Sequence, residues 1–412
     1  MTEKELDRGE IQGFSLSGRA GATVFIDNGG KVLAQPWSDT RHGPELKSLL
    51  KTRKLPLYAA TLLAKYQWMK LNQPEVSERT RHLLYAKDFL LYRLTGATVT
   101  DPASGPDSLI WPDHDVPDSL LPSSQLPWTI AGELSPEAAG SFNCLAGIPV
   151  AVGAHDGICA NTGAGAINQN QYAITLGTHL VVRAISSSQP KDSLRFYGYP
   201  EDKHVIGGNA LMAGRALDWF IDNWVSTSEH DRNSIFSELD RAASRIGHGC
   251  NGLRFLPYLS GQLAPERRPD ATATFHGLTI NHTRSDMFRS VLEGSGFALC
   301  RVFNQVVDWL GEPASIGLTG SGVRGHTWTQ IIADTLQRPL SITDASSEGR
   351  GAAMFCAVAL GLYRDIDEAA QAMIHTTRVI EPDPAMATIY MELFGEWTRL
   401  STSIQELDQT LV

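Results

Sequence analysis

The sequence predicts an α/β protein of two domains with a cleft between them. With 412 residues, the chain is longer than one hydrophobic core usually organises, so two domains are expected. The second half alternates strand-like and helix-like segments as far as about Met373, which is typical of an α/β domain. The first half opens on short strands and continues into a helical subdomain. The predicted domains are residues 1–165 and 166–412.

The first domain is predicted to begin with a sheet. Across residues 11–33, short apolar runs are interrupted at Ser17 and Gly18 and again at residues 27–30, Asp-Asn-Gly-Gly. Such turn-forming residues between apolar runs are typical of β-hairpins. A sheet edge left bare so close to Met1 is a liability, because unpaired strand edges invite aggregation. We therefore expect the first domain to be incomplete at its N-terminus.

The remainder of the first domain is predicted to be helical and to end in a strand. Residues 44–95, Leu83 and Leu84 among them, carry apolar side chains at helical spacing, and Gly96 closes the last helix. The apolar residues 147–153 predict a buried strand.

The second domain is predicted to open with a hairpin over residues 172–184 that turns at Gly177 and Thr178. A terminal helix is expected over residues 386–407.

Composition narrows the partners to small molecules. The net charge of −10 provides no long-range attraction to nucleic acid or anionic lipid. Five cysteines lie far apart without a C-x-x-C pair, and the charged N-terminus excludes a secretory signal, so a cytoplasmic protein with reduced thiols is expected. The longest apolar run, residues 351–363, is too short to span a bilayer.

Asp156 is the strongest single candidate for chemistry. It follows the predicted strand and opens a helix of small residues, and ligands gather where strands end in α/β sheets. A hydroxyl that attacks phosphorus loses its proton, and a nearby carboxylate can accept it, as in kinases. Helix capping explains the same carboxylate by spacing alone. The adjacent His155 can likewise be explained as a histidine buried in the fold without a role in chemistry.

Two glycine-containing segments suit a nucleotide. The turn at Gly177 and Thr178 exposes backbone N–H groups and one hydroxyl, which can hold phosphate oxygens. Residues 316–325 form a predicted strand followed by G-x-G-x-x-G, and Asp344 lies about 20 residues further on, which matches the dinucleotide-binding fingerprint. A nicotinamide dehydrogenase is therefore a competing interpretation, although glycines at a helix start serve ATP equally well.

Two further segments carry weaker signals. Residues 348–361 place small side chains at helical spacing, which lets a helix lie close to a neighbour. Trp37, Asp39 and Arg41 form a polar cluster that suits sugar hydroxyls, and solvated surface side chains explain it as well.

Taken together, these segments resemble the FGGY carbohydrate kinases, the family of xylulokinase, gluconokinase and glycerol kinase, from about Ile11 to about Met373. The family's C-terminal signature is matched completely, by Ala273, Phe275, Gly277, Leu278, Asp286, Met287, Ser290, Val291, Leu292 and Glu293. Its N-terminal signature is matched in part, by Lys65, Tyr66, Trp68, Met69 and Asn72.

The resemblance implies the actin-like ATPase fold, in which two ribonuclease H-like domains close on a central cleft, the first binding sugar and the second ATP. It implies Asp156 as the catalytic base and as a candidate ligand of Mg²⁺. The candidate sugar-binding residues are Gly18, Arg19, Asp39, Arg41, His155 and Gly157. The candidate ATP-binding residues are Gly177, Thr178, Gly320, Ser321, Gly322, Arg324, Gly349, Gly351 and Ala352.

The chain departs from the family pattern in two ways. The family begins with a hairpin bearing an Asp-x-Gly-Thr type motif that contacts Mg²⁺ and the ATP phosphates, and no such motif precedes Ile11. This departure predicts weak catalysis. Where xylulokinases carry Gly-Gln-Met-His-Gly, residues 17–21 read Ser-Gly-Arg-Ala-Gly, and Gly157 replaces an Asn. This argues against xylulose itself, and Arg19 suits an acidic sugar because guanidinium pairs well with carboxylate.

The predicted function is ATP- and Mg²⁺-dependent phosphorylation of a sugar hydroxyl, on a pentulose such as xylulose or on a related ketose, polyol or aldonate. A catalytically impaired sugar- and nucleotide-binding remnant is the main alternative, and an NAD-dependent dehydrogenase is a distant one. The expected partners are the sugar and ATP, without nucleic acid or membrane, and a homodimer is left open.

Overall fold

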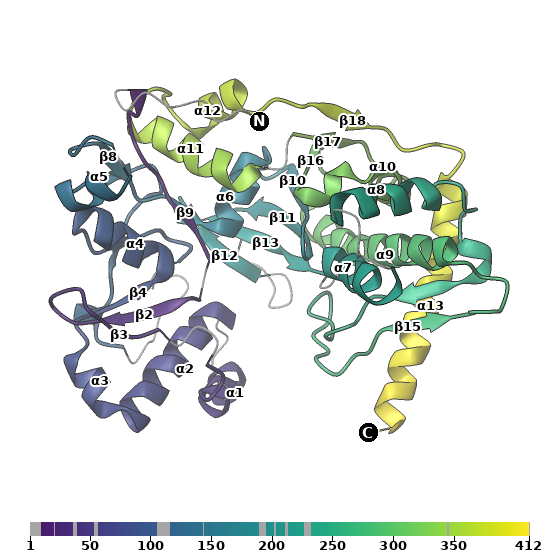
Figure 1. Cartoon of the computed structure of the whole chain (residues 1–412), viewed down its shortest axis with the longest axis horizontal. Helices are drawn as coiled ribbons and strands as arrows, with labels where there is room; N and C mark the ends of the chain where they lie inside the picture. Colours follow the sequence, from purple (N-terminus) through teal and green to yellow (C-terminus); the bar gives the residue numbers. More distant parts are fainter. Residues whose placement is uncertain are drawn as a thin grey trace.

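The computed structural model describes residues 10–19, 21–35, 39–52, 57–104, 116–142, 144–188, 195–201, 203–210, 213–225, 232–343 and 346–411. Figure 1 shows two lobes, with the first part of the chain in purple and blue on one side and most of the second part in green and yellow on the other, while the yellow-green helices α11 and α12 lie toward the first part. Helices α6 and α11 and strands β11 and β13 lie between the two lobes (Figure 1).

Small sheets and helices build the first lobe. Its elements are β1 (Ser17–Gly18), β2 (Thr23–Ile26), β3 (Val32–Ala34), α1 (Gly43–Thr52), α2 (Leu57–Asn72), α3 (Pro74–Arg79), β4 (His82–Tyr85), α4 (Ala86–Thr95), β5 (Val99–Thr100), the 3₁₀ turn η2 (Asp118–Leu120), β6 (Ser123–Ser124), β7 (Ile130–Glu133), α5 (Pro136–Phe142), β8 (Pro149–Ala151), β9 (Ala154–His155) and α6 (Asp156–Gly163). Strand β2 is the centre of the antiparallel sheet β3-β2-β4. The parallel pair β1-β9 ends beside α6.

A seven-stranded mixed sheet organises the second lobe. Its elements are β10 (Gln171–Leu176), β11 (Leu180–Ser186), β12 (Arg195–Tyr199), β13 (Lys203–Asn209), α7 (Ala213–Trp224), α8 (Arg232–Ala243), η3 (Cys250–Gly252), β14 (Arg254–Leu256), β15 (Thr274–His276), α9 (Arg284–Leu310), β16 (Ser315–Thr319), η4 (Ser321–Arg324), α10 (His326–Leu336), β17 (Leu340–Ile342), α11 (Ser347–Ala359), α12 (Ile366–Met373), β18 (Arg378–Ile380) and α13 (Ala387–Leu411). The strand order is β12-β13-β11-β10-β16-β17-β18, with parallel pairing in β10-β16 and β16-β17.

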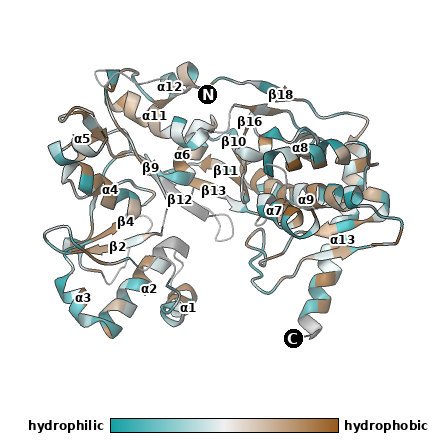
Figure 2. Cartoon of the chain, in the orientation of Figure 1, coloured by the Kyte–Doolittle hydropathy of each residue, from teal (hydrophilic) through white to brown (hydrophobic). Residues whose placement is uncertain are grey.

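The two faces of this sheet pack against different partners. On β11, Leu180, Val182 and Ala184 belong to the large core that contains the aromatic side chains of α9. Ile185, on the opposite face, packs with Ile158 of α6. In Figure 2 the central strands are largely brown, whereas α3 and α8 present teal, hydrophilic faces. Alternate side chains of β11 therefore point to opposite faces of the sheet. One set packs in the core of the second domain, and the other faces the first domain.

Helices α6 and α11 approach each other closely where the lobes meet. A Cβ added to Gly163 would lie 1.9 Å from the carbonyl oxygen of Ser347, and one added to Gly351 would lie 2.0 Å from that of Cys159. Arg350 of α11 donates from Nε to the carbonyl oxygen of Gly163 at 2.8 Å. The small side chains predicted over residues 348–361 therefore serve a tight helix contact.

Several predictions from the sequence are confirmed by the structure. Strands β10 and β11 form the expected antiparallel hairpin, and β2 and β3 flank the Asp-Asn-Gly-Gly turn. Gly96 ends α4 in the left-handed conformation with φ 78°, which a glycine adopts without a Cβ penalty. The terminal helix is α13.

Two predictions in the first domain were wrong. Ser17 and Gly18, expected to interrupt a strand, form β1 itself, and Leu83 and Leu84, expected in a helix, lie in β4. In both cases the segment is extended because it pairs with a strand from elsewhere in the chain. Strand β1 pairs with β9, and β4 pairs with β2. Such pairing overrides the local pattern.

Candidate active site

Asp156 stands at the first turn of α6, directly after β9. The residue that caps this helix is His155, whose Nδ1 accepts a hydrogen bond from the Gly157 N–H at 2.9 Å. Asp156 Oδ1 accepts from the same N–H at 2.7 Å and lies 3.0 Å from His155 Nε2. Because Nδ1 of His155 accepts, its ring proton is on Nε2 and donates to Asp156. Capping is therefore chiefly the role of His155, although Asp156 shares the N–H.

The two side chains differ in their access to solvent. The His155 side chain is 3% exposed and that of Asp156 is 45% exposed. Burial lowers the pKa of His155, outweighing the opposite effects of Asp156 and Asp101, so the imidazole is neutral. In the described part of the chain, no group donates to Oδ2 of Asp156. One carboxylate oxygen is thus held in place, and the other is open to a ligand.

Strand pairing brings Gly18 and Arg19 next to Asp156. Strand β1 runs parallel to β9, with Ser17 opposite Ala154 and Gly18 opposite His155. Because the carboxyl ends of parallel neighbours meet at one edge, Arg19 and Asp156 leave the pair on the same side. The sequence-predicted residues 18, 19 and 155–157 therefore lie together at the end of this strand pair.

A buried charge network lies beneath this strand pair. Lys87 Nζ is 2.7 Å from Asp88 Oδ1 and 3.2 Å from Asp101 Oδ1, and it donates to the carbonyl oxygen of Val152 at 3.2 Å. Burial would lower the pKa of Lys87, but the two carboxylates outweigh it and raise that pKa. A Cβ on Gly18 would lie 2.6 Å from Cβ of Lys87. The sequence analysis missed this network, because the adjacent Lys87 and Asp88 and the more distant Asp101 form no recognisable motif.

Asp39 and Arg41, the other predicted sugar contacts, pair with each other. The Arg41 guanidinium bonds both carboxylate oxygens of Asp39, with Nη2 to Oδ2 at 2.6 Å, and lies 4.1 Å from the centre of the Trp68 ring. These hydrogen bonds lower the pKa of Asp39 to about 2. Within the described residues, no interaction joins this pair to Asp156. Trp37 lies outside the described residues.

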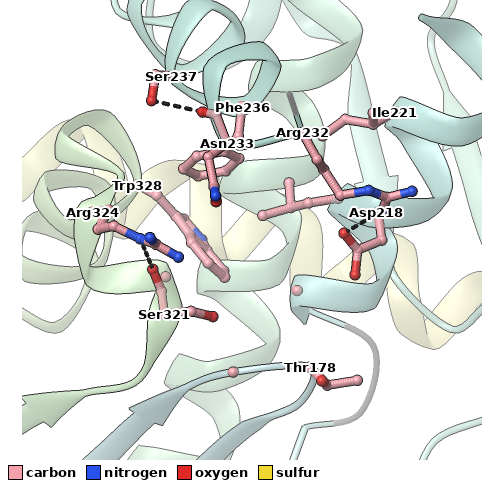
Figure 3. Close-up of a pocket in the computed structure, with 14 residues that line it drawn as sticks. Thr178, Asp218, Ile221, Arg232, Asn233, Phe236, Ser237, Ser321, Arg324 and Trp328 are labelled. Carbon is pink, nitrogen blue, oxygen red and sulfur yellow. Dashed lines mark hydrogen bonds and ion pairs between the residues drawn. The ribbon is translucent and has the colours of Figure 1, made fainter. Parts of the chain in front are cut away.

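A pocket in the second lobe collects most of the predicted ATP-binding residues (Figure 3). It is lined by Gly177, Thr178, Gly214, Leu217, Asp218, Ile221, Arg232, Asn233, Phe236, Ser237, Ser321, Gly322, Arg324 and Trp328. Gly320 adjoins it with φ 96°, and a Cβ there would lie 2.4 Å from the carbonyl oxygen of Leu176. The turns after β10 and β16 are therefore neighbours because those two strands pair in parallel.

The pocket combines aromatic rings with charged groups. Figure 3 shows the rings of Phe236 and Trp328 between Arg324 on one side and Arg232 with Asp218 on the other. Arg232 Nη1 bonds Asp218 Oδ1 at 2.8 Å. Flat apolar walls and guanidinium groups suit a base and phosphates, respectively. The sequence analysis missed the contributions of α7 and α8, because their pocket residues follow an ordinary amphipathic pattern.

Gly349, Gly351 and Ala352 lie elsewhere than this pocket. Gly351 faces α6, and Ala352 is buried among side chains of α6 and α12. Gly349 and Ala352 line a separate groove against residues 10–17. Their contact with adenine stays a prediction.

The donor set for Mg²⁺ is small. Over the described ranges, no three His, Cys, Asp or Glu side chains gather as a metal site. Mg²⁺ in phosphotransfer sites usually binds one or two carboxylates together with substrate phosphates and waters. The open Oδ2 of Asp156 fits that pattern as a single protein donor.

Comparison with known proteins establishes the family. Residues 172–360 match the C-terminal domain of the FGGY family of carbohydrate kinases, and residues 1–163 match its N-terminal domain. This chain belongs to the FGGY family. It is therefore a member of a phosphotransferase family, and the dehydrogenase interpretation of the glycine-rich segment loses its support.

Relatives and solved structures agree with this assignment. The chain is 25% identical to the xylulose kinase of Bacillus subtilis, over 98% of this chain and 85% of that protein. It is 28% identical to the gluconokinase of the same species, over 96% of this chain and 83% of the relative. The crystal structure of gluconate kinase from Lactobacillus acidophilus superposes with a TM-score of 0.85 at 22% identity, over 99% of this chain and 87% of that one. The fold is the expected actin-like ATPase fold.

No helix in the described ranges is long and apolar enough to cross a membrane. The homodimer left open by the sequence stays untested.

Proposed function

We propose that this FGGY kinase transfers the γ-phosphoryl group of ATP to a hydroxyl of a sugar or sugar derivative, with Asp156 as general base. One observation carries the proposal. Oδ1 of Asp156 is held by His155 Nε2 and the Gly157 N–H, and Oδ2 is left open in a side chain that is 45% exposed. A fixed carboxylate with one open oxygen can accept the proton that a hydroxyl loses as it attacks phosphorus.

Other residues of the two lobes are proposed to bind the sugar, the phosphates and the base. Gly18 and Arg19 lie beside it at the end of β1, where a sugar would contact the first domain. Thr178 and the backbone of Gly177 line the second-lobe pocket, where they suit the phosphates of ATP. Phe236 and Trp328 provide the apolar walls for the base. Asp156 is the candidate protein donor to Mg²⁺, which would supply neutralisation of the charge that develops during transfer.

The substrate class is left open by family membership. Relatives of this chain include proteins named xylulose kinase and gluconokinase, which act on a neutral ketose and on a sugar acid. A pentulose, another ketose, a polyol and an aldonate all fit the proposal at this level. We also propose that the two functional domains are residues 1–165 and 166–412.

The test is sugar-dependent ADP release by the purified chain with MgATP and a panel of ketoses, polyols and aldonates. Release with at least one sugar is expected, and Asp156→Asn should lower kcat by about 10²- to 10⁴-fold, since that is the usual contribution of a general base. Asp308→Asn, on the exposed surface of α9, is the matched control and should leave kcat unchanged. Full activity of Asp156→Asn would contradict the role of the base. Sugar and ADP binding without turnover would favour the impaired remnant.

A further inference from the structure

Arg183 is a buried cation at the contact between the lobes. It lies on β11 and is 9% exposed. Strand residues alternate between faces, so Arg183 shares the face of Ile185, which packs against Ile158 of α6. It therefore extends over the sheet toward the helix that begins at Asp156, away from the core of the second domain.

The residues next to Arg183 in the sheet are small. Arg183 stands opposite Ala173 on β10 and opposite Gly207 on β13. Gly207 has φ 149°, and a Cβ there would lie 1.9 Å from the carbonyl oxygen of Val182, so this position excludes side chains. The residues directly opposite Arg183 on both neighbouring strands are therefore small.

None of the carboxylates in the described residues neutralises the guanidinium of Arg183. Within the described part of the chain, its one hydrogen bond goes from Nη1 to the hydroxyl of Thr175 at 2.9 Å. Its Nε is buried without a partner, and none of the described carboxylates forms an ion pair with it. A buried guanidinium without a counter-ion is unfavourable, because burial removes its hydration. Such a group is stabilised when an anion binds.

The position of Arg183 distinguishes it from the groups around the phosphate turn. Its charge contributes to the lowered pKa of His155, which places it near the partner of Asp156. Arg19 and Arg215 are exposed, and their charges act instead on His179 in the turn that follows β10. Arg215 therefore lies near the turn at Gly177 and Thr178, whereas Arg183 lies near His155, the hydrogen-bond partner of Asp156.

We propose that Arg183 recognises a carboxylate in the sugar site, so that the preferred substrate is a sugar acid and not a neutral ketose or polyol. This inference rests on the proposed function and specifies its substrate class. A guanidinium binds a carboxylate through two parallel hydrogen bonds, and a hydroxymethyl group at the same place would leave the guanidinium unpaired. The same feature that admits the acid therefore rejects the neutral analogue.

Matched ligand pairs test the proposal by calorimetry on the full chain. D-Gluconate is compared with D-glucitol, and D-ribonate with ribitol, because each pair differs only in carboxylate against hydroxymethyl. At least one acid should bind the native chain about 10- to 100-fold more tightly than its polyol, the range expected for hydrogen bonds to a charged group. In Arg183→Met this preference should fall to about twofold or less. Arg183→Lys should retain part of it.

The controls separate a lost contact from a lost fold and from a phosphate contact. Arg338→Met removes an exposed arginine paired with Glu312 and should change no ligand affinity. Arg183→Met should unfold at the same temperature as the native chain or higher, since it removes a buried unpaired charge. If Arg183→Met unfolds at a lower temperature, the test uses the acid preference of Arg183→Lys alone. Weaker MgADP binding with an unchanged acid preference would assign Arg183 to the nucleotide and overturn the proposal.

Other outcomes are equally decisive. Equal affinity of the native chain for acid and polyol, or no binding of either pair, overturns the inference. Phosphorylation of neutral sugars alone would overturn the inference and keep the proposed kinase function. Selective binding of the acid without ADP release would support the inference about Arg183 and contradict the proposed kinase function.

Discussion

The surroundings of Asp156 and the pocket of Figure 3 hold their polar side chains in opposite ways. At Asp156, Gly18 and His155 lie in paired strands, His155 caps α6, and Lys87, Asp88 and Asp101 form a buried network. In the pocket, Arg232 and Asp218 are 50% and 52% exposed, and their pairing is set by two helices. The charged groups beneath Asp156 are therefore buried and paired, whereas those at the rim of the pocket are exposed to solvent.

The largest expected contrast is in stability. Lys87→Met leaves Asp88 and Asp101 buried without their cation, and should lower the free energy of unfolding by about 3–5 kcal/mol. Arg232→Met breaks only the exposed ion pairs with Asp218 and Asp222 and should cost less than about 1 kcal/mol. Urea denaturation of both variants measures the difference. Similar losses in the two variants would show that the two regions are not held differently.

The second contrast concerns the hydrogen bond from His155 to Asp156. His155→Asn keeps an acceptor for the Gly157 N–H but is expected to lose the donor to Asp156. We expect kcat to fall about 10- to 100-fold, as for loss of a hydrogen bond to a charged group, with MgADP affinity unchanged. Steady-state kinetics and calorimetry check this. An equal loss of MgADP affinity would point to a general structural defect.

His155→Asn should also change how the stability of the protein depends on pH. Burial lowers the pKa of His155 below its ordinary 6.5, so the native state disfavours its protonation. The resulting stability is present above pH 6.5 and is lost as the pH falls toward the lowered pKa. Native protein should therefore lose more stability than His155→Asn between pH 6.5 and 5. Parallel pH profiles would show that another group causes the loss.

On the nucleotide side, Phe236→Ala should weaken MgADP binding by about tenfold, because an aromatic contact is worth about 1 kcal/mol beyond its buried area. Sugar affinity should be unchanged. Phe394→Ala removes a half-buried ring of α13 that packs on Phe297 outside the pocket, and is the matched control. Calorimetry with MgADP distinguishes them, and equal affinities in the two variants would remove Phe236 from the nucleotide site.

The smallest effect is expected at the exposed pair of Asp39 and Arg41. Its hydrogen bonds lower the pKa of Asp39 to about 2 from 3.8, so its stabilising contribution is present above pH 3.8 and is lost as the pH falls through about 2. In Arg41→Met the carboxyl of Asp39 should titrate near 3.8 by NMR, with little change in stability. A titration still centred near 2 would mean that another group holds this carboxylate.

Residues that serve the site through local chemistry were predictable from the sequence. Asp156 follows an apolar strand and opens a helix, and Gly177 and Thr178 turn a hairpin, so chain-local patterns identified both. Lys87, Arg183, Phe236 and Arg232 were not found. Each belongs to an ordinary helix or strand pattern, and its importance comes from side chains that are distant in the sequence.

By itself the sequence determined the family, the α/β class, the hairpin of β10 and β11 and the position of Asp156, because these depend on local spacing and backbone preference. The tertiary structure decided that β1 pairs with β9, that His155 is the N-cap of α6, and that Arg183 is buried without an ion pair to any described carboxylate. These features depend on which strands pair and which charges are buried together. Both follow from the packing of distant segments, which a local pattern does not contain.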